Sequence, residues 1–277
     1  MIGVFMITFT AKKNDKLVKC VLENVKGVSF SAVMKLLRNK DVKVNGTRVN
    51  KDLKINTGDT VEIFYSPKIE EPISVIYSDE NVLIVDKKSG YTSEEIFEFL
   101  SKKEQVYFIH RLDRNTSGVM VFAKNETAEK ELISGFKNRS FIKIYAASVF
   151  KKMEKKEDVL TAYLIKDAEK STVKIYDKKV NGATEIKTGY KVISYDNKSN
   201  ISRLQVRLYT GKTHQIRAHL AFIGHPIVGD GKYGDNKMNK AVKVKSQILN
   251  AYSITFNFDK ENVLYYLDGK TFYSGEN

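Results

Sequence analysis

The chain has 277 residues, of which 42% are hydrophobic and 29% charged, a composition typical of folded globular proteins rather than disordered or fibrous ones. No apolar run approaches the roughly 20 residues of a membrane-spanning helix, and the apolar start lacks the preceding basic residues and the cleavage site of a signal peptide, so we expect a cytoplasmic protein without membrane contact. The formal net charge of +14 is compatible with nucleic-acid binding but also with a generally basic, soluble surface.

Arginine is used sparingly, because lysine supplies most of the positive charge. A guanidinium presents a rigid planar fork and an ammonium does not, so an arginine in a lysine-rich chain indicates a position that needs the fork. The arginines are Arg38, Arg48, Arg111, Arg114, Arg139, Arg203, Arg207 and Arg217. Four of them fall in the motifs discussed below.

The first 66 residues show the pattern of a small α+β domain. Apolar residues at helical spacing predict a helix over 29–39, with Ser29 as its cap. Apolar and polar residues alternate over 42–49 around Asn45-Gly46, which is a strong signal for a two-residue hairpin. A further turn then precedes a predicted strand at 61–63.

Two of the three prolines mark a boundary in the chain. Proline restricts both its own backbone and that of the residue before it, so the segment bracketed by Pro67 and Pro72 reads as an extended linker. We therefore predict an N-terminal domain over 1–66, a linker over 67–72 and a larger domain over 73–277.

The larger domain has more strand-like than helix-like segments. Helical patterns cover 93–102, 127–137 and 213–222, and strand patterns cover 81–86, 119–123, 141–150, 172–176, 187–193, 201–209 and 251–258. Because strands and helices do not alternate strictly, we predict an α+β fold with a large mixed or antiparallel β-sheet and flanking helices, preceded by the small α+β domain.

The N-terminal piece resembles the S4 RNA-binding domain. The resemblance rests on Ser-Phe-Ser-Ala-Val-Met-Lys-Leu-Leu-Arg, then Val-Lys-Val-Asn-Gly, then Gly-Asp-Thr-Val. It implies RNA contacts from a basic helix with Lys35 and Arg38 and from a hairpin with Lys43 and Arg48. The residues alone leave open an ordinary small domain with a solvated basic face.

The most informative segment is His110-Arg-Leu-Asp-Arg-Asn-Thr-Ser-Gly118, which places Asp113 between two arginines on a polar loop before an apolar strand. Neighbouring positive charge would hold the carboxylate ionised. The glycine and the hydroxyl groups suit a tight, hydrogen-bonded loop. Physical reasoning alone predicts a constrained, charge-flanked aspartate, and it leaves open a purely structural ion-pair loop.

Three ordered motifs resemble those of the RluA family of pseudouridine synthases. His-Arg-Leu-Asp-x-x-Thr-Ser-Gly is close to the signature whose aspartate is the essential catalytic residue, which maps to Asp113. Arg-Ser-Phe-Ile-Lys-Ile-Tyr is similar to the segment whose tyrosine packs against the target base, which maps to Tyr145. Gly-Lys-Thr-His-Gln-Ile-Arg, followed by the run 224–234, is similar to the motif around the arginine that pairs with the catalytic aspartate, which maps to Arg217.

The resemblance implies isomerisation of uridine to pseudouridine in RNA, a reaction without redox change or group donor, so we expect no cofactor and no metal. Asp113 would act at the ribose, either by attacking C1′ or by removing the 2′ proton. Arg217 would keep Asp113 charged and aimed, and Tyr145 would stack on the uracil and relay the C5 proton. Arg111 resembles the arginine that helps evict the base. Further RNA contacts are expected from His110, Arg114 and Lys143.

The sequence departs from the family pattern at four places, one of which is the short stretch between Gly90 and His110. Lys87-Lys-Ser-Gly90 stands where Lys-Pro-x-Gly is usual, Lys212 replaces an arginine, and Asn250 replaces a common histidine. None of these changes affects the three mapped residues, so they bear on the substrate loops rather than on the reaction.

Two other chemistries fit the sequence poorly. Thr-Gly-Lys-Thr at 210–213 resembles the end of a phosphate-binding loop, but Val206 stands where that loop needs glycine. His214 and His219 are five residues apart, which does not place two metal ligands on one helical face, and the single cysteine, Cys20, cannot build a multi-cysteine zinc site. We expect His110, His214 and His225 to make hydrogen bonds that brace loops.

RNA is therefore the expected partner of this chain, which we expect to be a monomer. The S4-like piece favours large-subunit ribosomal RNA as the substrate, with tRNA as the alternative. A non-catalytic RNA-binding or ribosome-assembly factor is the alternative of a different class. The joint presence of Asp113, Tyr145 and Arg217 argues against that factor, because binding alone does not need all three.

Overall fold

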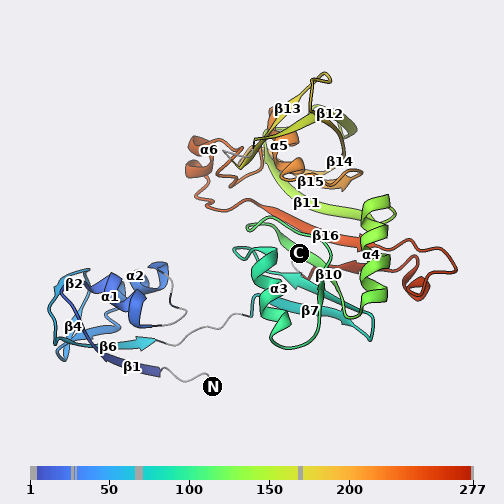
Figure 1. Ribbon diagram of the computed structural model, residues 1–277. Coiled ribbons are helices and arrows are strands. Elements are labelled where there is room, and N and C mark those ends of the chain that lie inside the picture. The colour runs from blue at the N-terminus through green and yellow to red at the C-terminus, as the bar shows by residue number, and fades with distance from the viewer. Residues whose placement is uncertain (1–4, 26–27, 29, 66–70, 168–170, 276–277) are drawn as a thin grey trace. The chain divides into compact units, whose positions relative to one another are not determined.

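The computed structural model describes residues 5–25, 28, 30–65, 71–167 and 171–275 (Figure 1). The chain divides into two compact units, Met1–Glu70 and Glu71–Asn277, called here the N-terminal unit and the C-terminal unit. Ser29 and most of the predicted linker 67–72 lie outside the described residues. Of the helices described, none is long and apolar enough to cross a membrane.

The N-terminal unit packs two helices against a four-stranded antiparallel sheet in the order β1-β6-β3-β4. Its elements are β1 (Phe5–Thr10), β2 (Asp15–Lys16), α1 (Leu17–Asn24), α2 (Phe30–Arg38), β3 (Val42–Val44), β4 (Thr47–Val49), β5 (Lys54–Ile55) and β6 (Thr60–Tyr65). Apolar residues of α1, α2, β3 and β6 form one core, which includes Leu17, Val21, Val33, Leu37, Val42 and Ile63. The small domain therefore has an interior of its own.

The predicted helix and hairpin of this unit are confirmed. Helix α2 covers most of the predicted 29–39 segment, and β3 and β4 are joined by Asn45 (φ 49°) and Gly46 (φ 77°). Positive φ at both central residues is what a two-residue hairpin turn requires. The Asn45 amide also donates to Asp59 (2.8 Å) and accepts from the Thr60 backbone N–H (2.9 Å), which ties the hairpin to the start of β6.

The C-terminal unit is built on an eleven-stranded sheet whose main path is β13-β12-β14-β15-β11-β16-β10-β8-β7. Its strands are β7 (Ile73–Ser78), β8 (Val82–Lys87), β9 (Tyr107–Phe108), β10 (Ser117–Ala123), β11 (Ile142–Phe150), β12 (Glu157–Asp167), β13 (Thr172–Tyr176), β14 (Thr184–Asp196), β15 (Ile201–Leu208), β16 (Leu249–Thr255) and β17 (Thr271–Tyr273). The pair β10 and β16 is parallel and the other pairs are antiparallel, so the predicted mixed sheet of an α+β fold is confirmed.

The β8–β10 part of the sheet is covered on both faces. Met120 and Phe122 share a core with Ile96 of α3, whereas Val119 and Val121, which alternate with them along β10, share another core with α4. Every residue of β10 is therefore buried. The helices of this unit are α3 (Ser93–Ser101), α4 (Glu126–Asn138), α5 (Gln215–Phe222), α6 (Asn236–Ala241) and the short η1 (Tyr265–Leu267).

The β14–β15 part is covered differently. Leu204 and Val206 of β15 are buried and share a core with Ile216 and Leu220 of α5. The residues that alternate with them point to the other face and are exposed: Arg203, Gln205 and Arg207. This half of the sheet thus has one face packed against α5 and one face open to solvent.

Candidate active site

The loop between β9 and β10 carries Asp113 and is held on both sides of it. The Ser93 hydroxyl at the start of α3 accepts from the Leu112 backbone N–H (2.8 Å) and donates to the Leu112 carbonyl (2.9 Å). On the other side, the Arg114 carbonyl accepts from the Lys87 ammonium (3.1 Å). The backbone at Asp113 is thereby fixed, while its side chain keeps 20% exposure.

Lys87 is fully buried and braces this loop. Its ammonium donates to the carbonyls of Lys88 (3.1 Å), Tyr91 (2.7 Å) and Arg114 (3.1 Å). A buried ammonium is tolerated only when its charge and donors are satisfied, and carbonyl oxygens supply that here. Although the proline common after this lysine is absent, the segment that follows Lys87 still wraps around its ammonium and contacts the Asp113 loop.

Gly118 explains why the loop motif ends in glycine. Its φ is +111°, and a Cβ there would lie 2.3 Å from the carbonyl oxygen of Ala251. Only glycine lets β10 come this close to β16, where Ser117 and Gly118 pair in parallel with Asn250 and Ala251. The Asn250 amide donates to the Ser117 hydroxyl (3.0 Å). Asn250, which stands where a histidine is common, therefore links β16 to β10 next to the Asp113 loop.

Arg217, on the first turn of α5, joins two carboxylates. Its Nη1 donates to Asp113 Oδ2 at 2.8 Å. Its Nε and Nη2 donate to the two oxygens of Asp230 at 2.7 Å and 3.0 Å, a bidentate pair. One edge of the guanidinium is therefore held by Asp230, and the remaining nitrogen is aimed at Asp113.

This charge cluster is largely removed from water. The Arg217 side chain is 9% exposed and that of Asp230 is fully buried. Burial opposes the charge on both groups, but their mutual hydrogen bonds and attraction outweigh it, lowering the pKa of Asp230 and raising the pKa of Arg217. Asp230 Oδ1 also accepts from the backbone N–H groups of Lys232 (2.8 Å) and Tyr233 (3.0 Å). Arg217 and Asp230 therefore hold each other in their charged forms.

His214 and Tyr233 form the other wall of the charge cluster. His214 Nε2 lies 3.9 Å from Asp113 Oδ1, and its Nδ1 lies 2.8 Å from the Tyr233 hydroxyl. That hydroxyl accepts from the Val173 backbone N–H (2.8 Å), and the Tyr233 ring faces the Arg217 guanidinium at 5.3 Å. Burial lowers the pKa of His214, which favours a neutral imidazole. When Tyr233 donates to Nδ1, the proton of His214 sits on Nε2 and faces Asp113.

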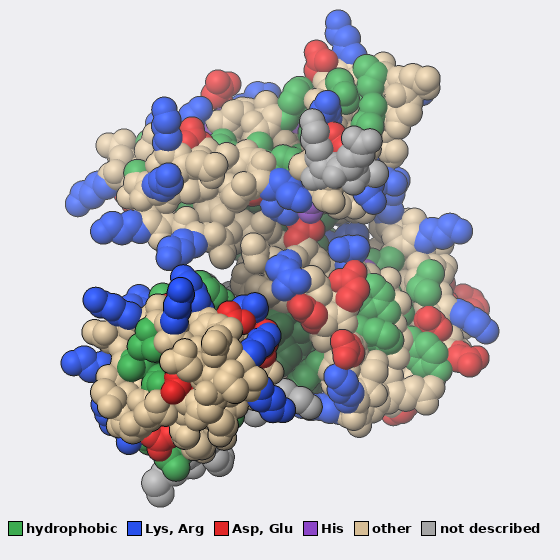
Figure 2. All heavy atoms as spheres, turned by 60° about the vertical axis from the view of Figure 1, so that its left-hand side comes forward, with side chains coloured by type: hydrophobic (Ala, Val, Ile, Leu, Met, Phe, Trp, Pro, Cys, Tyr) green, Lys and Arg blue, Asp and Glu red, His purple; other side chains and the backbone are tan. Residues whose placement is uncertain are grey.

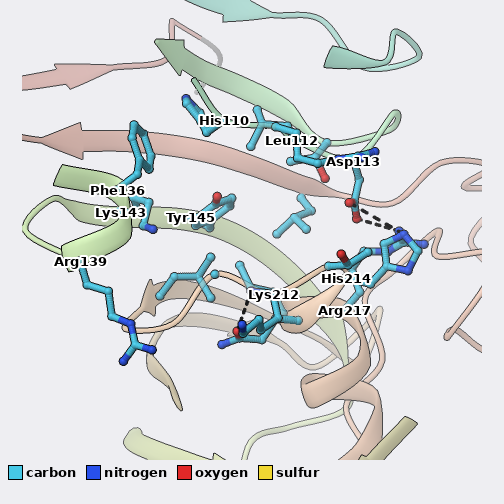
Figure 3. Close-up of a pocket in the computed structure, with 18 of the residues that line it drawn as sticks. His110, Leu112, Asp113, Phe136, Arg139, Lys143, Tyr145, Lys212, His214 and Arg217 are labelled. Carbon is cyan, nitrogen blue, oxygen red and sulfur yellow. Dashed lines mark hydrogen bonds and ion pairs between the residues drawn. The ribbon is translucent and has the colours of Figure 1, made fainter. Parts of the chain in front are cut away.

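Asp113 and Arg217 line a cavity of about 470 Å³. Figure 3 shows Tyr145, on β11, and Asp113, on its loop, around the same space, with His214 and Arg217 beside Asp113. Tyr145 packs where the cores under α3 and α5 meet. Burial, followed by the charge of Asp113, raises the pKa of Tyr145, so its hydroxyl keeps its proton at neutral pH. The structure thus brings the three mapped residues to one cavity.

The opposite end of the cavity combines an aromatic pair with a cation. His110 stacks on Phe136 with ring centroids 4.4 Å apart, and its Nε2 accepts from the Val121 backbone N–H (3.0 Å). Burial, followed by the charge of Lys143, lowers the pKa of His110 to about 3, so the ring is neutral. The Lys143 ammonium lies 5.5 Å from the Phe136 ring centroid and lines the cavity. His110 is therefore a hydrogen-bonded brace, and Lys143 supplies positive charge at this end together with Arg139 and Lys137, which also line the cavity.

The two arginines beside Asp113 in sequence do not pair with it, which corrects one expectation. Arg111 lies 3.4 Å from Glu94, and Arg114 lies 3.3 Å from Glu95, both at the start of α3. Adjacent loop side chains point in different directions, so the arginines reach the helix while Asp113 points into the cavity. The cationic side chain that pairs with Asp113 is instead Arg217, which lies 104 positions further along the chain.

The basic residues predicted in the N-terminal unit lie on its surface. Lys35 and Arg38 are exposed on α2. In the hairpin, Lys43 and Arg48 lie over the Phe64 ring, with 5.1 Å and 5.6 Å to its centroid. The helix and the hairpin thus each carry two of the four residues that are predicted to contact RNA.

Sequence reasoning missed Asp230, Tyr233 and Phe136 as parts of the site. The first two stand in the run 224–234 of the third motif, which was a signal that the region matters but not that it holds Arg217. Phe136 lies on α4, outside the motifs, and gave no signal. Within the described ranges, no group of three or more His, Cys, Asp and Glu side chains could hold a metal ion.

A family model described as RNA pseudouridylate synthase matches residues 81–222, which include Asp113, Tyr145 and Arg217. The chain belongs to this family. The predicted pseudouridine synthase is thereby confirmed, and the S4 character of the N-terminal unit stays a prediction. As an RNA pseudouridylate synthase, the chain is an enzyme that isomerises uridine in RNA.

Relatives that align with most of the chain are also named as RNA pseudouridine synthases. An uncharacterized RNA pseudouridine synthase of Aquifex aeolicus is 34% identical over 80% of this chain and 78% of its own. Another of Mycoplasma pneumoniae is 30% identical over 91% and 88%. Ribosomal large subunit pseudouridine synthase C of Haemophilus ducreyi is 30% identical over 87% and 83%.

The fold of this pseudouridylate synthase also matches solved structures. Human RNA pseudouridylate synthase domain containing 1 aligns with a TM-score of 0.62 and 24% identity over 72% of this chain and 84% of the human one. Human RNA pseudouridylate synthase domain containing 4 aligns with a TM-score of 0.55 and 21% identity over 66% and 84%. At these identities the likeness supports the fold.

Proposed function

We propose that this enzyme converts uridine to pseudouridine in large-subunit ribosomal RNA, with Asp113 as its catalytic carboxylate. The observation that carries the assignment is the position of Asp113: it lines the cavity beside Tyr145 and is paired with a buried arginine that a second carboxylate holds. The likeness to ribosomal large subunit pseudouridine synthase C supports the choice of RNA.

Asp113 acts at the ribose of the target nucleotide. The N1–C1′ bond breaks, the uracil turns, C5 bonds to C1′, and the proton on C5 leaves while N1 gains one. A carboxylate at the cavity wall can attack C1′ or remove the 2′ proton, and both routes need it ionised. Arg217 favours that form, because its Nη1 is aimed at Asp113 and its other two donors are already used by Asp230.

Tyr145 offers the turning uracil an aromatic face and a hydroxyl. Stacking between a flipped base and an aromatic side chain contributes about 1–3 kcal/mol in single-strand binders. Since its raised pKa keeps the hydroxyl protonated, Tyr145 relays the C5 proton by passing its own proton toward N1, which has to gain one, as its oxygen receives the proton from C5. The hydroxyl thus serves proton transfer, and the ring serves binding.

The target nucleotide has to leave its helix to reach Asp113. Arg111 stands beside the aspartate in the loop, with a side chain 64% exposed and paired with an exposed Glu94. Exposed ion pairs contribute only about 0–1 kcal/mol, so Arg111 can exchange Glu94 for RNA at little cost and fill the place of the evicted base. His110, Arg114 and Lys143 complete the proposed contacts around the nucleotide.

The N-terminal domain predicted over 1–66 adds RNA contact area as an S4-like domain, joined by the linker 67–72 to the catalytic domain 73–277. Lys35, Arg38, Lys43 and Arg48 supply its positive charge, and phosphate contacts of this kind raise affinity without reading sequence. Figure 2 shows Lys and Arg side chains spread over the face in view, with fewer Asp and Glu side chains among them.

Pseudouridine mapping of total RNA from cells with and without the gene tests the substrate. We expect uridines of large-subunit ribosomal RNA to lose their pseudouridine signal when the gene is deleted. Loss confined to tRNA would assign the enzyme to tRNA instead. An unchanged pseudouridine map would contradict both assignments.

A further inference from the structure

The open face of β14 and β15 carries a basic surface that lies outside the active site. We call it the outer face and define it by Lys187 and Lys191 of β14 and Arg203 and Arg207 of β15, all of them exposed. The two strands are paired in register, with Gly189 opposite Arg207 and Lys191 opposite Gln205. Because side chains alternate along a strand, this surface points away from the face that packs on α5.

The use of arginine singles this surface out. Of the eight arginines, four stand in the motifs around the active site and two in the N-terminal unit, which leaves Arg203 and Arg207. They are four residues apart on one strand, so their Cα atoms are about 13 Å apart on the same face. Among the described residues, no carboxylate lies within 4.0 Å of either guanidinium. Arg203 is attracted electrostatically by Asp196, farther than 4.0 Å away, and Arg207 has no ion pair among these residues.

Tyr209 organises one end of the outer face. The Arg207 guanidinium lies 4.8 Å and the Lys187 ammonium 5.2 Å from its ring centroid, so both cations contact one aromatic ring. A Cβ at Gly189 would lie only 3.2 Å from that ring, so glycine there leaves room for it. Because the ring already carries two cations, the surface offers positive charge rather than a bare ring, which suits phosphate better than a nucleobase.

A short turn connects the outer face to the rim of the cavity. The turn after β15 runs from Tyr209 on the outer face to Gly211 and Lys212, which line the cavity. Thr210 fixes this turn, since its hydroxyl accepts from the Lys187 backbone N–H (2.9 Å) and donates to Gln215 (2.9 Å). An RNA strand that leaves the cavity over 211–212 and passes around this turn would meet Lys187 and Arg207.

We propose that the outer face binds the phosphate backbone of RNA that flanks the target uridine, without sequence preference. The inference rests on the proposed function for the presence of RNA in the cavity. Glu157 of β12 pairs in register with Lys191, Glu185 lies two residues before Lys187 on β14, and Asp196 lies near Arg203, so acids border the positive area. Its centre is the group Lys187, Arg203 and Arg207.

The test is the full-length variant Arg203→Gln/Arg207→Gln, assayed on two RNAs that share one target site: a long ribosomal transcript and a minimal hairpin. We expect KM for the long transcript to rise severalfold with kcat unchanged, and both constants for the hairpin to stay as in the wild type. For binding to the long transcript, the slope of log affinity against log salt should become shallower by about 1.4, because about 0.7 is lost per phosphate contact with a single strand.

The matched control is Lys130→Gln/Lys260→Gln, which removes the same charge from exposed positions elsewhere in the C-terminal unit. A salt slope and a KM for the arginine variant equal to those of this control would overturn the proposal. If the wild type formed no pseudouridine in the transcript, the substrate assignment would fail. The salt slope for binding that transcript would still decide for or against the outer face.

Discussion

Arg217 is an arginine because it has to serve two carboxylates in fixed directions. Its Nε and Nη2 bind Asp230 as a fork, and Nη1 is left for Asp113. A lysine offers three donors around a single point and cannot hold both carboxylates in this geometry. The buried Asp230 therefore sets the position of Arg217, and Arg217 in turn positions the Asp113 side chain.

We expect Arg217→Lys to impair turnover although it keeps the charge. Loss of the charge-assisted hydrogen bond to Asp113, about 1.5–3 kcal/mol, corresponds to a roughly 10- to 100-fold lower kcat. Single-turnover kinetics on an RNA with a known site measure the effect, and thermal unfolding checks that the variant folds. A folded variant with wild-type kcat would show that the fork is not needed.

Tyr145 separates binding from proton transfer. Tyr145→Phe keeps the ring and should retain RNA affinity while losing most turnover, since a positioned proton-transfer group contributes roughly 10²–10⁴-fold. Tyr145→Ala should also weaken binding, by about 1–3 kcal/mol. Binding and turnover of both variants are measured on one RNA. Full turnover by the Phe variant would make Tyr145 a stacking platform only, and full turnover by the Ala variant would remove it from the mechanism.

At the residue scale, the sequence predicted Asp113, Tyr145 and Arg217 through motifs, and the structure brings them to one cavity. The sequence could not predict which cation pairs with Asp113. The nearest arginines in sequence turn to Glu94 and Glu95, because contact depends on the direction of side chains in a fixed loop rather than on sequence spacing.

At the scale of elements, the strongly patterned segments were predicted and the weakly patterned ones were not. Helix α1 was missed because it has no side-chain cap and includes valines, which are weak helix formers. Strand β12 was missed because Val159 and Ile165 add apolar residues on the exposed side, which hides the alternation of Leu160, Ala162 and Leu164. Pairing with β13 and β14 fixes β12, and such long-range pairing is not visible in a local pattern.

The packing of α5 against β14 predicts sensitivity to acid. His219 of α5 is buried and contacts the Thr188 hydroxyl (3.0 Å), and burial lowers its pKa to about 4. The unfolded chain binds this proton near pH 6.5 and the folded chain does not, so stability is full above pH 6.5 and is lost as pH falls toward about 4. Urea unfolding at pH 7 and pH 5 should show the loss, and His219→Gln should reduce it. Equal pH dependence in both proteins would contradict a neutral, buried His219.

At the scale of the whole molecule, the two units have separate cores, so each is expected to fold without the other. Removal of residues 1–66 should leave a folded enzyme that still modifies a short hairpin, because the residues that line the cavity all belong to the C-terminal unit. Binding to long RNA should weaken, with a flatter salt dependence, as phosphate contacts are lost. An unchanged salt slope would mean that the N-terminal unit does not bind RNA.

The most direct test of the account is Asp113→Asn, which keeps the size of the side chain and removes its charge. Tritium release from RNA that carries uridine labelled at C5 reports the reaction, and RNA binding and thermal unfolding serve as controls. We predict that the variant folds, binds RNA nearly as the wild type does, and releases no tritium above background. Tritium release at the wild-type rate would contradict the assignment of Asp113 as the catalytic carboxylate.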